Sequence, residues 1–142
     1  MGLGGLRIGY LLTANQKIKE KVKKHLPIWN INSVAERFIE LFPDFKKDYE
    51  DSIKKTIKDR DFLFKKLKEI SYLEPYEPQA NFIFCKTDIS SRKIAETLFN
   101  KYNILIKCGL NQKELKSDSY IRIGVRKEED NKKIISALNN IK

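Results

Sequence analysis

The sequence predicts an α/β protein (an α+β, two-layer arrangement) with helices packed on one face of a small sheet. From about residue 71 onward, strand-like and helix-like patterns alternate, an order typical of such a two-layer unit. Before this part, apolar residues recur at helical spacing from Asp44 to Ile70. Hydrophobic residues make up 41% of the chain and charged residues 34%, which is the composition of a folded chain rather than a disordered one.

The first 43 residues predict a strand followed by two helices. Leu6–Leu12 is an apolar run that follows a glycine-rich start, and this pattern predicts a strand. Thr13 opens a polar segment that can cap a helix running to about His25. A second helix is expected between the polar turn Trp29–Ser33, which can cap it, and Pro43, which stops it.

The third predicted helix is long. Asp44–Ile70 would measure about 40 Å, because an α-helix rises 1.5 Å per residue. That is more than one small core needs, so we expect this helix to link two parts of the molecule. The apolar residues that fit the helical period are Phe45, Tyr49, Ile53, Ile57, Phe64, Leu67 and Ile70.

A stiff, proline-containing connector, Glu74–Pro78, separates the long helix from the alternating part of the chain. The sequence contains no internal repeat. The elements expected after the connector are a strand over Asn81–Lys86, a helix over Ser91–Tyr102, a strand over Ile104–Lys107, a polar loop over Cys108–Ser119, a strand over Tyr120–Arg126 and a helix over Glu128–Ile141.

The net charge of +10 raises the question of a nucleic-acid partner. The lysines, however, are spread over several predicted helices among acidic residues, and no aromatic stacking pattern or RNA-binding motif accompanies them. We therefore expect a solvated helix face and no nucleic acid as partner. The densest cluster is Lys17, Lys19, Lys21, Lys23 and Lys24.

The residues also argue against a membrane span, a disulfide and a metal site. No apolar run approaches the roughly 20 residues of a membrane span, and the start lacks the basic region of a signal peptide, so we expect a soluble, cytoplasmic protein. Cys85 lies in an apolar run where a buried free thiol is usual, and Cys108 carries little information. His25 is the single histidine and no Cys-x-x-Cys is present, so we expect no metal site.

Arg122 is the first candidate for ligand binding. Along the strand Tyr120–Arg126 the period of two places Ile121 and Ile123 on one face and Arg122 on the other. Gly124 leaves room beside the guanidinium, and an arginine fixed on a strand suits bidentate binding of a carboxylate or phosphate. The alternative is a surface arginine on a half-exposed sheet.

Arg7 is the second candidate. Glycines at positions 2, 4, 5 and 9 surround it, and glycine lets the backbone approach a ligand closely. A glycine-rich backbone beside an arginine can form an anion site. The same glycines can also simply build a tight turn.

Four segments, in order, resemble one family. Gly-Leu-Gly-Gly-Leu-Arg-Ile-Gly-Tyr (Gly2–Tyr10) is similar to the stretch after the cofactor lysine of fold-type I, class I/II aminotransferases that use pyridoxal 5'-phosphate (PLP). The turn Trp29-Asn30-Ile31-Asn32, the strand start Ala80-Asn81-Phe82 and the ending Tyr120-Ile121-Arg122-Ile123 with Glu128-Glu129-Asp130-Asn131 resemble the histidinol-phosphate aminotransferase branch. The set covers essentially the whole chain, as a C-terminal portion.

The resemblance implies a role for three residues. Arg7 matches the arginine that contacts the PLP phosphate, and Arg122 matches the arginine that binds the substrate α-carboxylate. Asn81 matches a position at the edge of the substrate pocket. PLP is thus the implied cofactor, and the implied partner is a small-molecule amino-acid substrate.

The resemblance also implies a division of the chain. Residues 1–43 would end the cofactor-binding large domain, residues 44–70 would form the linking helix, and residues 71–142 would form the small C-terminal domain. The missing N-terminal portion of the enzyme is then a further partner, and the complete enzyme is expected to be a homodimer.

The catalytic lysine of the family falls before Met1 when the motifs are matched. No lysine of the chain stands in the matching position, so no catalytic residue is expected within these 142 residues. The aspartate that pairs with the pyridine nitrogen of the cofactor is absent as well. We expect the isolated chain to be inactive.

Two departures leave the branch of the family open. Arg126 stands where many transaminases have glycine, so it is either a second cation for a substrate phosphate or a surface residue before the last helix. Lys107-Cys108 replaces a frequent Arg-Asp. Endings with the second arginine also occur in threonine-phosphate decarboxylases and in aminotransferase-like domains fused to nucleotidyltransferases. The alternatives are therefore a PLP enzyme similar to threonine-phosphate decarboxylases and, from another class, a basic binding module without catalysis.

Overall fold

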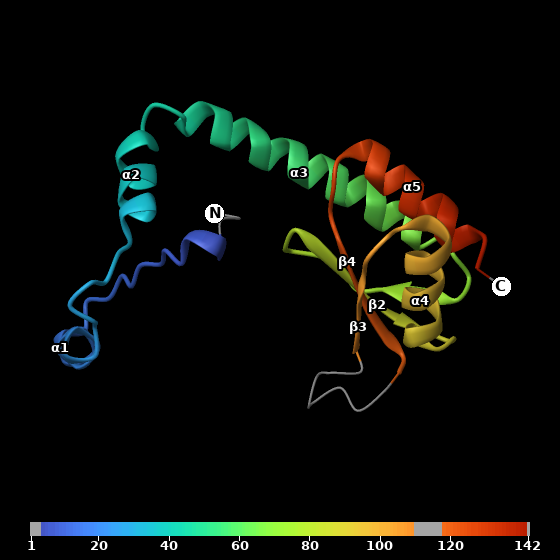
Figure 1. Ribbon diagram of the computed structural model, residues 1–142, viewed down its shortest axis with the longest axis horizontal. Coiled ribbons are helices and arrows are strands. Elements are labelled where there is room, and N and C mark those ends of the chain that lie inside the picture. The colour runs from blue at the N-terminus through green and yellow to red at the C-terminus, as the bar shows by residue number, and fades with distance from the viewer. Residues whose placement is uncertain (1–3, 110–117, 142) are drawn as a thin grey trace. The chain divides into compact units, whose positions relative to one another are not determined.

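The computed structural model describes residues 4–109 and 118–141 of the chain, which divides into two compact units, Met1–Tyr49 and Glu50–Lys142 (Figure 1). Gly2 and Leu3 of the glycine-rich segment, and most of the expected loop Cys108–Ser119, lie outside the described residues. None of the helices described is long and apolar enough to cross a membrane.

The unit Met1–Tyr49 contains a short 3-10 helix, Gly4–Leu6, and the helices α1 (Gln16–Lys24) and α2 (Ser33–Leu41). The side chain of Asn15 accepts hydrogen bonds from two N–H groups in the first turn of α1. Asn32 does the same for one N–H at the start of α2. Asparagine at the N-cap satisfies donors that a helix leaves unpaired, which confirms both predicted helix starts.

The strand predicted over Leu6–Leu12 is wrong in this structure. After Leu6 the chain runs to Asn15 without regular secondary structure, and Arg7 adopts a positive φ of 54°. A strand needs a neighbour for its backbone hydrogen bonds. All four strands among the described residues instead pair with one another, in a sheet that lies within Leu73–Gly124.

The long helix is confirmed, but it is shorter than predicted at both ends. Helix α3 spans Lys46–Leu67 rather than 44–70. Leu63 and Leu67, in its last turns, are fully buried in the core, whereas Ile53 and Ile57 further up the helix are exposed. Only the C-terminal part of α3 therefore contributes to the core of the unit Glu50–Lys142.

The sheet has four strands in the order β1-β2-β4-β3, and every pair is antiparallel. Strand β2 lies at the centre beside β4, with Ile83 opposite Ile123 and Cys85 opposite Ile121. The edge strand β1 overlaps the start of the segment Glu74–Pro78, which the sequence predicts as a connector. The strand bounds are Leu73–Pro75 for β1, Phe82–Thr87 for β2, Lys107–Cys108 for β3 and Tyr120–Gly124 for β4.

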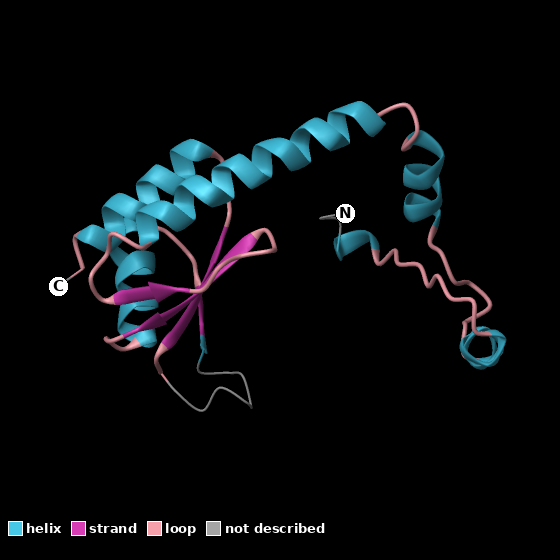
Figure 2. Cartoon of the chain, turned by 180° about the vertical axis from the view of Figure 1, so that it is seen from behind, coloured by secondary structure: helices cyan, strands magenta, loops and turns pink. Residues whose placement is uncertain are grey.

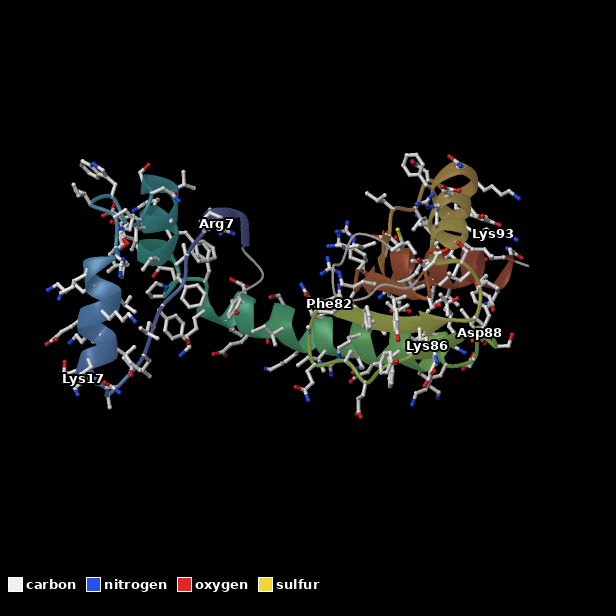
Figure 3. The ribbon with its side chains drawn as sticks, turned by 90° about the horizontal axis from the view of Figure 1, so that it is seen from below. Arg7, Lys17, Phe82, Lys86, Asp88 and Lys93 are labelled. Carbon is white, nitrogen blue, oxygen red and sulfur yellow. The ribbon has the colours of Figure 1, made fainter. Side chains whose placement is uncertain are left out.

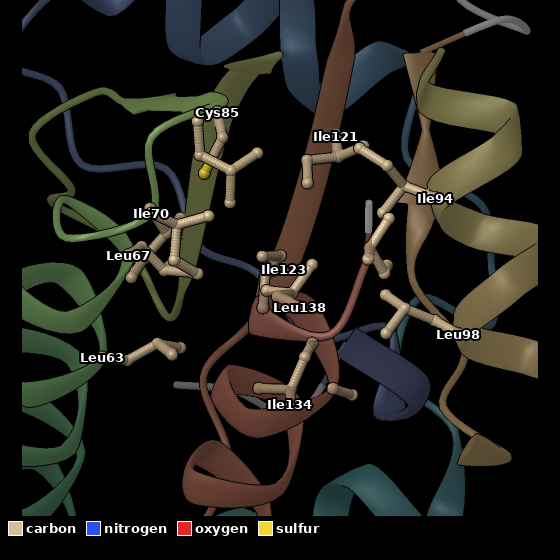
Figure 4. Packing of buried hydrophobic residues seen from close by; sticks show 14 residues of the cluster. Leu63, Leu67, Ile70, Cys85, Ile94, Leu98, Ile121, Ile123, Ile134 and Leu138 are labelled. Atoms are coloured by element: carbon tan, nitrogen blue, oxygen red, sulfur yellow. The ribbon is translucent and has the colours of Figure 1, made fainter. Parts of the chain in front are cut away.

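Two further helices, α4 (Ser91–Tyr102) and α5 (Glu128–Asn139), cover one face of this sheet together with the end of α3 (Figure 2). The main hydrophobic cluster between helices and sheet consists of apolar side chains and the Cys85 thiol (Figure 4). This arrangement confirms the two-layer prediction. The core residues are Leu63, Leu67, Ile70, Leu73, Ile83, Cys85, Ile94, Leu98, Ile121, Ile123, Ile134, Ala137, Leu138 and Ile141.

Asp118, just before β4, fixes the start of α4. Its carboxylate accepts hydrogen bonds from the hydroxyls of Ser90 and Ser91, the latter at 2.7 Å, and from the backbone N–H of Arg92 at 3.0 Å. These bonds to Ser90, Ser91 and Arg92, in that order, hold the pKa of Asp118 below its usual range.

Candidate functional site

The open face of the sheet, opposite the helices, carries Arg122. Ile121 and Ile123 are buried, while Arg122 and Gly124 are exposed on the other side of β4. This confirms the alternation expected from the sequence. We define the open face by the outward residues of β4 and their register partners on β2, namely Tyr120, Arg122 and Gly124 with Lys86, Phe84 and Phe82.

Aromatic rings occupy much of the open face. The rings of Phe84 and Tyr120 stack with centroids 5.3 Å apart, and Tyr76 stacks on Phe84 at 5.8 Å. Burial and the neighbouring Tyr120 and Glu74 raise the pKa of Tyr76. This row of rings was missed in the sequence, although Phe82 and Phe84 at alternating positions of one strand were a signal for it.

Arg122 lies over another ring of the same face. Its guanidinium carbon is 5.0 Å from the centroid of the Phe82 ring, which is the geometry of a cation–π contact. Phe82 lies at the start of β2 (Figure 3). Within the described part of the chain Arg122 makes no ion pair, so its N–H donors are available to an anion.

Lys107 on β3 is the direct register partner of Arg122. Side chains of directly opposite residues in an antiparallel pair point to the same face, about 5 Å apart at Cβ. Two cations therefore lie side by side, both exposed. In the sequence Lys107 stands out only as a departure from a family pattern, because strand register depends on contacts between distant residues.

Arg126 lies beyond the strand, since β4 ends at Gly124 and not at position 126 as predicted. Its side chain is 75% exposed, with its Nε atom 3.8 Å from a carboxylate oxygen of Asp130. It lines two clefts of about 760 and 350 Å³, and Lys55 and Lys127 line the smaller one with it. The structure thus gives Arg126 two cationic neighbours, Lys55 and Lys127, and the acidic neighbour Asp130.

The backbone of Arg126 is held by Asn131, which is fully buried. The Asn131 side chain accepts a hydrogen bond from the Arg126 N–H at 3.0 Å and donates one to the Arg126 carbonyl at 2.8 Å. It also donates to the carbonyl of Asp59 on α3 at 3.4 Å. One amide side chain thus connects the turn after β4 to two helices.

Asn81 lies directly before β2 and is exposed. Its carbonyl accepts a hydrogen bond from the N–H of Val125 at 2.9 Å, which continues the β2–β4 ladder by one pair. Its predicted place at the edge of a substrate pocket stays a prediction.

Arg7 belongs to the other unit, Met1–Tyr49. It is exposed and makes no ion pair among the residues described. With Lys19 and Lys23 of α1 it lines a pocket of about 650 Å³ that has apolar walls and, among the described residues, no acidic lining residue. Three cations without a carboxylate suit a phosphate group attached to an apolar ring.

The cysteines and the histidine take no part in this site. Cys85 and Cys108 are free thiols. Cys85 on β2 and Cys108 on β3 are both register partners of Ile121 on the strand between them, so the two cysteines lie two strand spacings, or about 10 Å, apart. Burial raises the pKa of Cys85 to about 12. His25 is the exposed C-cap of α1. Nowhere in residues 4–109 or 118–141 do three His, Cys, Asp or Glu side chains gather as a metal site would need.

Known proteins resemble the chain in both sequence and structure. The family model described as "Aminotransferase class I and II" matches residues 1–138. The CMP-5'-(3-aminopropyl)phosphonate synthase of Streptomyces rubellomurinus is 30% identical over 99% of this chain and 23% of its own length. The L-serine phosphate decarboxylase of Sulfurospirillum multivorans is 31% identical over 99% of this chain and 36% of its own length.

A solved structure shares the fold. The histidinol-phosphate aminotransferase from Clostridium acetobutylicum superposes with a TM-score of 0.85 at 31% identity, over 97% of this chain and 41% of that one. The chain therefore spans less than half the length of each of these three relatives.

Proposed function

The chain belongs to the aminotransferase class I and II family, and we propose that it forms the C-terminal portion of a PLP-dependent aminotransferase. The complete enzyme would transfer an amino group between an amino acid or amino-alcohol phosphate and a 2-oxo acid. The family match favours an aminotransferase over a basic binding module without catalysis. The cytoplasmic location and the homodimeric state of the complete enzyme remain predictions.

The observation that carries the proposal is the state of Arg122. A guanidinium that is fixed on a strand, exposed and without an acidic partner in the described part of the chain is suited to hold a substrate carboxylate by two parallel hydrogen bonds. In this role Arg122 binds and orients the substrate.

The residues of the unit Met1–Tyr49 fit the phosphate of the cofactor. Arg7 would hold it, since the pocket that Arg7 lines is cationic and has apolar walls. When bound, PLP supplies the electron sink that amino-group chemistry requires. The chain's own part is to bind that phosphate and the substrate.

A phosphate or phosphonate group on the substrate is supported by two observations. The names of three relatives contain a phosphorylated or phosphonate compound. In this chain Lys107 stands beside Arg122, which adds a second cation for a second anionic group. We propose Arg126 as the alternative contact for that group, with Lys55 and Lys127 beside it.

Decarboxylation of an amino-acid phosphate is the second candidate reaction, because one relative is an L-serine phosphate decarboxylase. Product analysis on the complete enzyme separates the two reactions. With O-phospho-L-serine and 2-oxoglutarate, an aminotransferase forms glutamate, whereas a decarboxylase releases carbon dioxide. Release of neither, with a panel of phosphorylated and free amino acids, would refute both.

For the 142-residue chain alone we propose no turnover, because none of its lysines matches the position of the cofactor lysine in the family. Glutamate formation by the purified chain with added PLP would contradict this. A steep salt dependence of nucleic-acid binding by the same preparation would instead revive the binding-module alternative.

A further inference from the structure

Gly124 occupies a distinctive position on the open face. It follows Arg122 by two residues on β4 and lies in register opposite Phe82 on β2. The three residues therefore form one corner of the sheet surface, with Arg122 diagonal to Phe82. Diagonal neighbours in an antiparallel pair are within reach of a long side chain.

Neither backbone conformation nor close packing requires glycine at this position. Gly124 does not have the positive φ that favours glycine, and a Cβ built on it would meet nothing within 4 Å. Glycine is otherwise a poor strand residue, because it packs no side chain and loses more conformational freedom on folding. Its presence here calls for another physical reason.

The missing side chain leaves the ring of Phe82 uncovered. A larger residue at 124 would lie directly opposite Phe82, with Cβ atoms about 5 Å apart, and would compete for the face of the ring. With glycine there, the guanidinium of Arg122 lies over that face at 5.0 Å.

The other side of Arg122 is occupied. Tyr120, two residues earlier on the strand, stacks nearly parallel on Phe84, the direct partner of Arg122, with an interplanar angle of 5°. Tyr76 extends this stack. The stacked rings fill the space toward the start of β4, so the Phe82 side is where the arginine side chain finds room.

The contact of Arg122 with the Phe82 ring leaves the donors of the guanidinium available. All five N–H groups of arginine lie in the plane of the group, at its edge. A cation over a ring is attracted by the ring face and not by a hydrogen-bond acceptor, so this contact restricts the motion of the group without occupying all of its donors.

We propose that Phe82 and Gly124 are positioning residues for Arg122, which hold its guanidinium in one orientation for a carboxylate ligand. Phe82 supplies the ring, and Gly124 keeps that ring accessible. The inference rests on the proposed function insofar as Arg122 binds the carboxylate. A cation–π contact at an exposed site is worth a factor of roughly two to five in an equilibrium constant, and we take this factor as the expected loss of affinity when the contact is removed.

The experiment uses the full 142-residue chain and four single variants. Phe82→Leu removes the aromatic ring, and Phe82→Tyr keeps it. Gly124→Val fills the space over the ring, and Gly124→Ala adds only a Cβ that meets nothing. Far-UV circular dichroism checks folding, and if Gly124→Val does not fold, the Phe82 pair alone decides.

Two measurements are made on each variant. The first is the NMR signal of the Arg122 Nε–Hε group, whose chemical shift reports the ring current of Phe82 and whose ¹⁵N relaxation reports side-chain order. The second is a titration with O-phospho-L-serine followed by the same signal. Exposed Arg92 on α4, for which the described residues show no cation–π contact, provides the reference signal of an arginine without a ring beside it.

We expect the wild type, Phe82→Tyr and Gly124→Ala to show a shifted, ordered Arg122 signal. In Phe82→Leu and Gly124→Val the signal should resemble that of Arg92, and affinity for the probe should fall about two- to fivefold. An unchanged Arg122 signal in Phe82→Leu overturns the proposal. If the signals behave as expected but the wild type does not bind the probe, positioning is upheld and carboxylate binding by Arg122 fails.

Discussion

Replacing Asn131 with alanine should destabilise the unit Glu50–Lys142 by about 3 kcal/mol. The Asn131 side chain is fully buried and makes three hydrogen bonds, two to the backbone of Arg126 and one to the carbonyl of Asp59. It thereby joins β4, α5 and α3 through one amide. The prediction tests whether this connection stabilises the fold as the geometry implies.

The magnitude follows from the separate bonds. The two bonds to Arg126, at 3.0 and 2.8 Å, each contribute about 1 kcal/mol net, while the 3.4 Å bond to Asp59 is weaker. Alanine would also leave backbone groups of Arg126 without a partner, at about 1–3 kcal/mol for each group that water cannot reach. If at most one of these groups is out of reach of water, the sum lies between about 2 and 5 kcal/mol.

Urea unfolding followed by far-UV circular dichroism measures this loss. Tryptophan fluorescence would not serve, because the single tryptophan, Trp29, is exposed and belongs to the other unit. Asn139→Ala, at the exposed end of the same helix, is the matched control and should change the free energy of unfolding by less than about 0.5 kcal/mol. Equal, small losses in both variants would refute the reasoning.

Three further outcomes are expected. Burial raises the pKa of Cys85 from its usual 9.0, and that of Tyr72 from its usual 10.0, to about 12. The unfolded chain therefore loses these protons first, so the free energy of unfolding should fall as pH rises from 9 to 12. Tyr72→Phe should lessen this loss in alkaline unfolding curves. The pKa of Asp118 is lowered, so its contribution to the free energy of unfolding is present above the usual value near 3.8 and is lost as pH falls below it. Asp118→Asn should flatten the loss of stability at acidic pH in unfolding curves. In the complete enzyme, Arg122→Lys should lower kcat/KM for amino-acid substrates about tenfold or more, because lysine cannot make the paired hydrogen bonds of a guanidinium; an unchanged kcat/KM would remove Arg122 from the substrate site.

The helices of the Glu50–Lys142 unit were predictable because their signals are local. Helix α4 spans the predicted range Ser91–Tyr102. Ser90 caps its start by accepting a hydrogen bond from a first-turn N–H, and Asn103 ends it in a left-handed conformation with φ of 54°. Both residue types favour these positions through their own short side chains, so a single sequence reveals the helix ends.

Strand β1 could not be predicted in the same way. It ends at Pro75, a residue that cannot donate a hydrogen bond to a neighbouring strand and therefore argued for a connector. The proline is tolerated because β1 lies at the edge of the sheet and pairs only with β2. Whether a strand is at an edge depends on how distant segments pair, and the local sequence does not contain that information.

The candidate site also contains one feature that local sequence predicts and others that depend on strand pairing. The alternation of β4 alone placed Arg122 on the open face, because side-chain direction along a strand has a period of two. Its neighbours Lys107 and Phe82 come from strands that lie 15 and 40 residues earlier, and only the register brings them beside it. The sequence therefore predicts the position of Arg122 on the open face, but it does not reveal which residues lie beside its guanidinium.

The segment Leu6–Leu12, which the sequence predicts as a strand, is apolar but largely exposed, and it pairs with no strand among the described residues. The side chains of Tyr10 and Leu12 are 86% and 90% exposed, and Ala35 is the one buried hydrophobic residue among positions 5–49. Such an apolar run is costly in water unless it is covered, and a strand without a neighbour has no partner for its backbone. The solved aminotransferase of which this chain covers 41% has enough further chain to supply both. We therefore expect the amides of residues 6–12 to exchange slowly with solvent in the complete enzyme and rapidly in the chain alone. Equal, fast exchange in both would mean that the apolar pattern of this segment does not encode a strand.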